Sequence, residues 1–224
     1  MTASISPTRD VSATIKYVVR GEKSTFYAGD RDRSYWPGED HQMVVHDMRP
    51  ERAEFALERN GFVLLDEPTD VTDFADAGEK ARYCGQAEAL VQRLTGADKV
   101  ISFGPILRTN ATGTHGHNQP AYGAHVDYGA RTVADFTRQL LPPDEAEARL
   151  AGRHMLLNVW RPLAMVESAP FALCDARTVR REDMFDSDPE AVQVTAHTAV
   201  EDPTAPHGAA PRQSIELRTI AFLG

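Results

Sequence analysis

The stretch Ala124-His125-Val126-Asp127-Tyr128 places a histidine and an aspartate two residues apart. In a β-strand, residues two apart point to the same face, so a strand here would present the imidazole of His125 beside the carboxylate of Asp127. A second histidine, His197, follows far downstream. Two histidines and one carboxylate form the facial triad that binds Fe(II) and leaves coordination positions open. We therefore take His125, Asp127 and His197 as candidate metal ligands.

The last strand that the sequence predicts, residues 212–222, alternates between a polar face and an apolar face. The polar face carries Arg212, Ser214, Glu216 and Arg218. A charged face that turns inward is costly unless it binds a polar or anionic group, and the alternative is an edge strand whose polar face lies in water. A fixed guanidinium binds a carboxylate with two hydrogen bonds, so this strand is a candidate anion site.

Length and composition describe one globular domain. The chain has 224 residues, of which 42% are hydrophobic and 25% charged, as in ordinary globular proteins. The net charge of −9 argues against a nucleic-acid surface, which needs a basic patch. The sequence has neither an apolar run that would span a bilayer nor the N-terminal features of a signal peptide. Cys84 and Cys174 lack the spacing of a disulfide framework or a metal pair, so we expect a reduced, cytoplasmic protein.

Apolar periodicity predicts the order of the elements. Strands are expected at residues 11–20, 42–46, 62–65, 100–103, 154–162, 171–174 and 212–222, and helices at 49–59, 73–95 and, with a break near 140–143, 132–151. This order favours an α+β or mainly β chain with a sandwich or barrel core and helices outside. We expect one domain, in which residues 1–97 pack on a core formed by residues 98–224.

Other side chains compete for the metal or could line a pocket. His115 and His117 also lie two apart, in a polar, glycine-containing segment. No strand fixes their relative orientation there, so they rank behind His125 and Asp127 as ligands, although loops of this kind often carry function. The candidate pocket residues are His115, His117, Tyr122, Tyr128 and Trp160, and the last two suit a core equally well.

The order of these motifs resembles the signature of Fe(II)/2-oxoglutarate-dependent dioxygenases, in which His-x-Asp, a distal His and Arg-x-Ser follow one another. Further blocks resemble the hydroxylase/desaturase group of bacterial and fungal secondary metabolism, which includes relatives of a cephalosporin methoxylation protein and of a fungal endoperoxide-forming enzyme. These blocks are Asn158-Val159-Trp160-Arg161-Pro162, Ala172-Leu173-Cys174-Asp175-Ala176, Asp186-Ser187-Asp188, His197-Thr198-Ala199 and Pro211-Arg212-Gln213-Ser214-Ile215-Glu216-Leu217-Arg218. The resemblance extends over residues 80–224.

The resemblance implies a double-stranded β-helix core (a jelly roll, as in cupins) with flanking helices. It implies that His125, Asp127 and His197 hold Fe(II), and that Arg212 and Ser214 grip the distal carboxylate of 2-oxoglutarate, with Arg218 as the alternative clamp. The implied activity is O2-dependent oxidation of a small-molecule C–H bond, by hydroxylation, desaturation or a related reaction.

Two other functions stay open at this point. A cupin-like isomerase or lyase would share the metal but would not need Arg212, and an inactive relative would only bind. The partners that we expect are a small-molecule substrate and, at most, a second copy of the chain in a homodimer, with no nucleic acid and no membrane.

One region is shorter than the resemblance implies. Members of the group carry a longer segment between the block at Asp175 to Val179 and the Asp-Ser-Asp block that starts at Asp186. A core that lacks strands leaves unpaired edges, which β-proteins avoid. We therefore expect a break in the chain between Val179 and Asp188, at a segment that acts as a lid over the substrate. The alternative is a natural deletion in an inactive relative.

Overall fold

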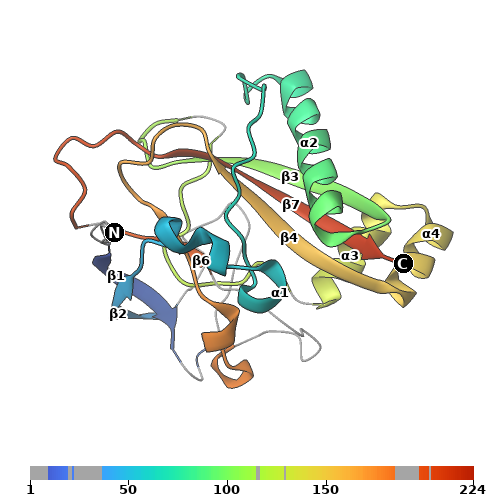
Figure 1. Ribbon diagram of the computed structural model, residues 1–224, viewed down its shortest axis with the longest axis horizontal. Helices are drawn as coiled ribbons and strands as arrows, with labels where there is room; N and C mark the ends of the chain where they lie inside the picture. The colour runs from blue at the N-terminus through green and yellow to red at the C-terminus, as the bar shows by residue number, and fades with distance from the viewer. Residues whose placement is uncertain are drawn as a thin grey trace, which may run out of the picture.

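The structure is a computed structural model that describes residues 10–19, 22, 37–114, 117–128, 130–184, 197–201 and 203–224. Antiparallel sheets and helices alternate along the chain (Figure 1). The strands are β1 (Val11–Val18), β2 (Gly38–Val45), β3 (Lys99–Thr109), β4 (Arg153–Pro162), β5 (Phe171–Leu173), β6 (His197–Ala199) and β7 (Gln213–Leu223). The α-helices are α1 (Leu57–Asn60), α2 (Ala77–Thr95), α3 (Ala130–Leu140) and α4 (Pro143–Ala151), and the 3-10 helices are η1 (Arg49–Glu54), η2 (Ala176–Thr178) and η3 (Arg181–Asp183).

The largest sheet has the strand order β3-β7-β4, and both pairs are antiparallel. Its central strand, β7, is the predicted last strand, and its side chains divide as the alternation predicts. Ile215 and Leu217 are fully buried and pack with Tyr83 and Ala87 of α2. Helix α2, which begins after the capping residue Asp76, therefore covers one face of this sheet.

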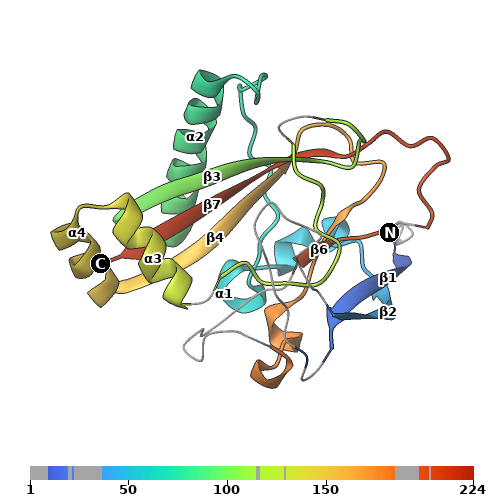
Figure 2. The same ribbon diagram turned by 180° about the vertical axis from the view of Figure 1, so that it is seen from behind.

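The other face of the sheet has two parts. Ile220 and Phe222 pack against α3 and α4, which lie at the end of the sheet where the chain finishes (Figure 2). Nearer the start of β7, the same face carries Ser214, Glu216 and Arg218, since all five side chains are separated by multiples of two residues. One strand thus joins an apolar core to a polar site.

A β-bulge in β3 turns an additional side chain toward the polar part of this face. The register shifts between Phe103 and Ile106, where Gly104 adopts a positive φ of 58°. The extra residue reverses the alternation of the strand after the bulge. As a result, Arg108 becomes the cross-strand partner of Ser214 and lies on the polar face.

Two small antiparallel sheets, β1-β2 and β5-β6, complete the strand pairing of the described residues. The segment around Ala124 runs between them, because the Ala124 amide donates to the Lys16 carbonyl of β1 (2.8 Å) and His125 forms an isolated bridge with His197 of β6. The segment that carries the His-x-Asp motif is therefore fixed from both sides.

The mixed helix-and-strand class with antiparallel sheets is confirmed, and two local predictions are wrong. The apolar run 62–65 is not a strand, and Leu64 and Leu65 are 38% and 39% exposed. Among the residues that the structure describes, the run has no partner strand, and Phe62 instead stacks on Phe55 at 5.2 Å between ring centroids. Residues 124–128 are extended but pair only at His125.

The break and lid expected between Val179 and Asp188 fall partly on residues 185–188, which lie outside the described residues. Up to Met184 the chain continues through η2 and η3. Within the described ranges, the helices are too short or too polar to cross a membrane.

Candidate metal centre

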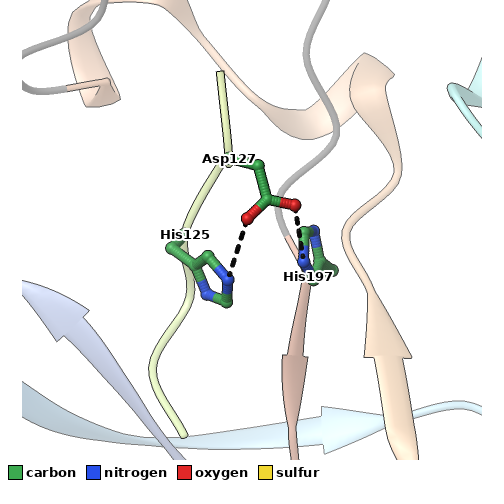
Figure 3. Close-up of side chains that lie close together, drawn as sticks. All are labelled: His125, Asp127 and His197. Carbon is green, nitrogen blue, oxygen red and sulfur yellow. Dashed lines mark ion pairs between the residues drawn. The ribbon is translucent and has the colours of Figure 1, made fainter. Parts of the chain in front are cut away.

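The side chains of His125, Asp127 and His197 lie together and offer one ligand atom each within 4.8 Å of one another (Figure 3). Nε2 of His125 is 3.8 Å from Oδ1 of Asp127, and Nε2 of His197 is 3.6 Å from Oδ2. These separations are longer than hydrogen bonds. Only 11–15% of each side chain is exposed. Two imidazole nitrogens and a carboxylate therefore converge on one shielded point.

Backbone pairing brings the two histidines together, although they are distant in the sequence. The His125 amide donates to the His197 carbonyl (3.3 Å), and the His197 amide donates back (3.1 Å). His197 is also paired with Leu173 through the β5-β6 ladder. The two rings consequently lie 4.5 Å apart between centroids.

The hydrogen bonding and burial of both imidazoles favour the form that binds a metal. Nδ1 of His125 donates to the Gly123 carbonyl at 2.7 Å, which fixes the tautomer whose unprotonated Nε2 faces Asp127. Metal-bound histidines are commonly oriented by such a bond. Burial, reinforced by the neighbouring His125, lowers the pKa of His197, so the neutral imidazole is favoured, as metal binding requires.

Two donors on neighbouring strands hold the carboxylate of Asp127. Nδ2 of Asn158 donates to Oδ2 at 2.5 Å, and Nη2 of Arg218 lies 3.4 Å from Oδ1. Asn158 and Arg218 are cross-strand partners on β4 and β7. The main sheet thus orients Asp127 through both of its carboxylate oxygens.

A cavity adjoins this centre. It is lined by His125 and His197, by the guanidinium-bearing residues Arg108 and Arg212, and by Trp160. The remaining lining residues are Ala121, Phe171, Thr198, Ala199 and Glu216. The cavity therefore joins the candidate metal ligands to the polar face of β7.

Arg212 brings into this cavity a positive charge that no carboxylate of the described residues pairs with. It is only 2% exposed, its Nη1 donates to the Ala169 carbonyl at 2.7 Å, and its guanidinium lies 5.8 Å from the centre of the Trp160 ring. Burial lowers the pKa of Arg212 to about 10. Nε of Arg212 and the buried Oγ of Ser214 have no hydrogen-bond partner among the described residues. A buried cation beside an unpartnered hydroxyl is suited to an anionic ligand.

Arg108, the other guanidinium at the cavity, is already neutralised. Its Nε lies 2.7 Å from Oε2 of Glu216, and its Nη1 donates to the Gln119 carbonyl at 3.0 Å. Oε1 of Glu216 in turn lies 3.4 Å from Nε of Arg218. The sequence did not identify Arg108 or Asn158 as site residues, because their partners are 108 and 31 residues away along the chain.

The five candidate pocket residues differ in where they lie, and only some of them are near the cavity. Trp160 lines the cavity and stacks on Phe171 at 4.9 Å. Tyr128 lies below the guanidinium of Arg218 (5.2 Å) and beside aromatic side chains that pack on α3. Tyr122 is 40% exposed. His117 is exposed, and His115 lies outside the described residues.

Comparison with known proteins identifies relatives of this chain. The family model described as oxidoreductase/YMDC permease-like domain matches residues 5–189 and 183–222, two ranges that overlap at residues 183–189. Oxidoreductase AN1597 of Emericella nidulans is 33% identical over 65% of this chain and 52% of its own length. Hydroxylase/desaturase CTB9 of Cercospora beticola is 31% identical over 64% of this chain and 49% of its own length. The chain thus spans about half the length of these two relatives.

Another relative matches over most of both chains. The Fe(II)/2-oxoglutarate-dependent dioxygenase nvfI of Aspergillus novofumigatus is 26% identical over 82% of this chain and 84% of its own length. A solved structure of the iron and alpha-ketoglutarate-dependent endoperoxidase NvfI superimposes with a TM-score of 0.80 at 24% identity, over 99% of this chain and 100% of that one. The two proteins share a fold.

Proposed function

Since the chain belongs to the hydroxylase/desaturase group of Fe(II)/2-oxoglutarate-dependent dioxygenases, we propose that it oxidises a small natural-product molecule with Fe(II), 2-oxoglutarate and O2. Membership rests on the family model, which spans most of the sequence, and on relatives named as dioxygenases and hydroxylase/desaturases. The resemblance that the motifs carry is thereby confirmed.

His125, Asp127 and His197 hold the iron in this proposal. Two imidazole nitrogens and one carboxylate oxygen are a donor set that suits Fe(II) and leaves positions open for other ligands. The hydrogen bond from His125 to Gly123 and the two donors on Asp127 support this role, because they orient the ligands from outside.

Arg212 and Ser214 bind the distal carboxylate of 2-oxoglutarate. The observation that carries the proposal is that Nε of Arg212 and Oγ of Ser214 are buried and have no partner in the part of the chain that the structure describes, beside a cavity that Arg212 shares with both histidines. Arg218, the alternative clamp, is engaged with Asp127 and Glu216 instead. A cupin-like isomerase or lyase would have no use for a buried guanidinium that no carboxylate of the described residues pairs with at this place.

Fe(II) and 2-oxoglutarate, when bound, supply an O2-dependent oxidation of a C–H bond together with the conversion of 2-oxoglutarate to succinate and CO2. The chain binds, orients and shields these groups. Trp160 and Phe171 form an apolar wall of the cavity, which keeps water away from the buried guanidinium. Hydroxylation, desaturation and related oxidations are all compatible with this arrangement.

We extend the proposal to the architecture of the core. A double-stranded β-helix core within residues 98–224, with residues 1–97 packed on it, accounts for two antiparallel sheets, β3-β7-β4 and β5-β6, that both contribute residues to one cavity. The free cysteines Cys84 and Cys174 agree with a reducing, cytoplasmic location.

Binding of 2-oxoglutarate to the metal-loaded protein tests this function directly. Without O2, the Fe(II) protein should gain a visible charge-transfer absorption on addition of 2-oxoglutarate, and succinate should form once O2 is admitted. Asp127→Ala should lose both signals, whereas the matched control Asp135→Ala, at an exposed position of α3, should keep them. A protein that binds the metal but not 2-oxoglutarate would favour the isomerase or lyase.

A further inference from the structure

Four charged side chains form a continuous row from the cavity to the metal triad. Arg108, Glu216, Arg218 and Asp127 follow one another at 2.7, 3.4 and 3.4 Å between their closest charged atoms. Their exposed side-chain fractions are 14, 7, 23 and 11%. We call this row the ionic chain.

Glu216 occupies the centre of the ionic chain, where each carboxylate oxygen meets a different guanidinium. Oε2 accepts from Arg108, and Oε1 lies beside Nε of Arg218. Buried guanidiniums are costly unless a carboxylate pairs with them. If Glu216 lost its charge, Arg108 would keep its contact with the Gln119 carbonyl, and Arg218 would keep Asp127 as its carboxylate neighbour among the described residues.

The direction of Arg218 depends on contacts at two of its edges and on one ring. Its Nε edge faces Glu216, its Nη2 faces Oδ1 of Asp127, and the ring of Tyr128 lies 5.2 Å from its guanidinium carbon. Nε of Arg218 and Oε1 of Glu216 form an ion pair without a hydrogen bond, and because the guanidinium is planar and rigid, their attraction at Nε affects where Nη2 points. Glu216 therefore sets the angle at which Arg218 reaches the metal-binding carboxylate.

We propose that Glu216 is a positioning residue for the metal centre, acting through Arg218 on the orientation of the Asp127 carboxylate. This inference rests on the proposed function, because it takes Asp127 as a metal ligand. Without the charge of Glu216, the Arg218 guanidinium loses one of its two carboxylate neighbours, and its contact with Oδ1 of Asp127 is less well fixed. Glu216 also neutralises Arg108, which leaves Arg212 as the cavity guanidinium that no carboxylate of the described chain pairs with.

The surroundings of Glu216 in β7 indicate that its side chain has an orienting role and does not merely fill space. Further along β7, the same face of the strand buries Ile220 and Phe222 in an apolar core. An apolar residue would satisfy packing at position 216 equally well. A buried carboxylate that contacts two guanidiniums is expected where orientation matters, and Trp160 is its cross-strand neighbour on the cavity side.

The affinity for Co(II), measured by titration calorimetry on the full chain, tests the inference without turnover. We expect Arg218→Gln to weaken Co(II) binding by about tenfold or more, as loss of a group that orients a metal ligand commonly does. Glu216→Gln should weaken it by a similar factor. In the Arg218→Gln background, Glu216→Gln should have no further effect, because residues that act in one network are not additive.

Two further variants separate positioning from charge and from folding. Arg218→Lys keeps the positive charge but lacks the rigid fork, so it should lose affinity as Arg218→Gln does, and it tests the inference even if Glu216→Gln fails to fold. The matched control is Glu88→Gln, since Glu88 accepts hydrogen bonds from Ser102 on the α2 side of the sheet, and it should bind Co(II) as the wild type does.

The outcomes separate this inference from the proposed function. Wild-type affinity in Glu216→Gln or Arg218→Lys would overturn the positioning role, and so would equal losses from Glu216→Gln in both backgrounds. If the wild type binds Co(II) and Asp127→Ala does not, the proposed metal site stands whatever these variants show. If the wild type fails to bind Co(II), both proposals fall.

Discussion

Asp127 is the residue on which the metal centre depends most, because it is the only anionic group among the three candidate ligands. Asp127→Ala should reduce metal affinity by more than about 100-fold, beyond the range typical of groups that merely orient ligands. Metal affinity and succinate formation both measure this loss. Asp127→Ala protein that bound Fe(II) with wild-type affinity would show that the metal lies elsewhere.

Arg212 should determine the affinity for 2-oxoglutarate and leave the metal in place. Removing one partner of a buried charged pair costs about 2–5 kcal/mol, so Arg212→Ala should raise the KM for 2-oxoglutarate by at least about 30-fold. Co(II) affinity, measured on the same preparation, should stay near the wild-type value. A larger KM defect in Arg218→Ala than in Arg212→Ala would move the carboxylate clamp six residues along the strand.

At the scale of the element, the two faces of β7 have different roles: Leu217 on one face contributes to stability, and Ser214 on the other contributes to binding. Leu217 is fully buried against α2, so Leu217→Ala should lower the free energy of unfolding by about 2–5 kcal/mol. Ser214 is also buried, but its hydroxyl has no partner among the described residues. Ser214→Ala should therefore retain or exceed wild-type stability while weakening 2-oxoglutarate binding.

Urea denaturation and titration of 2-oxoglutarate on the same two variants check this division. If Ser214→Ala lost as much stability as Leu217→Ala, the hydroxyl would be part of the folded core and not of a ligand site. A normal affinity for 2-oxoglutarate in Ser214→Ala would contradict its place in the clamp.

The same strand shows how much the sequence could predict. Alternation alone divided residues 212–222 correctly into two faces, but it left open whether the polar face meets water or a cavity, because this depends on the elements packed against the strand. The sequence shows Asn158 only as part of a block that carries the resemblance, since nothing local connects it with Asp127. The run 62–65 was apolar enough for a strand, but strand formation requires a partner that the pattern does not provide.

At the scale of the whole molecule, the metal centre connects parts of the chain that are otherwise separate. His125 lies on an extended segment, His197 on β6, and the groups that hold Asp127 on β4 and β7. A metal bound there interacts only with the folded protein. Ligand at 100 times its Kd should then stabilise the fold by about 2.7 kcal/mol.

Thermal unfolding with and without a metal measures this linkage. Addition of Co(II) and 2-oxoglutarate should raise the Tm of the wild type, and a chelator should reverse the increase. The Tm of Asp127→Ala should not respond to either addition. An equal increase in both proteins would place the stabilising metal outside the triad.

The position of the metal itself tests the account most directly. Anomalous diffraction at the iron edge, from crystals loaded with Fe(II) without O2, should show one peak enclosed by Nε2 of His125, Nε2 of His197 and an oxygen of Asp127, at about 2.0–2.2 Å from each. With 2-oxoglutarate added, its distal carboxylate should lie against Arg212 and Ser214. A peak at any other group of residues, or no peak in protein that is otherwise folded, would contradict the central claim.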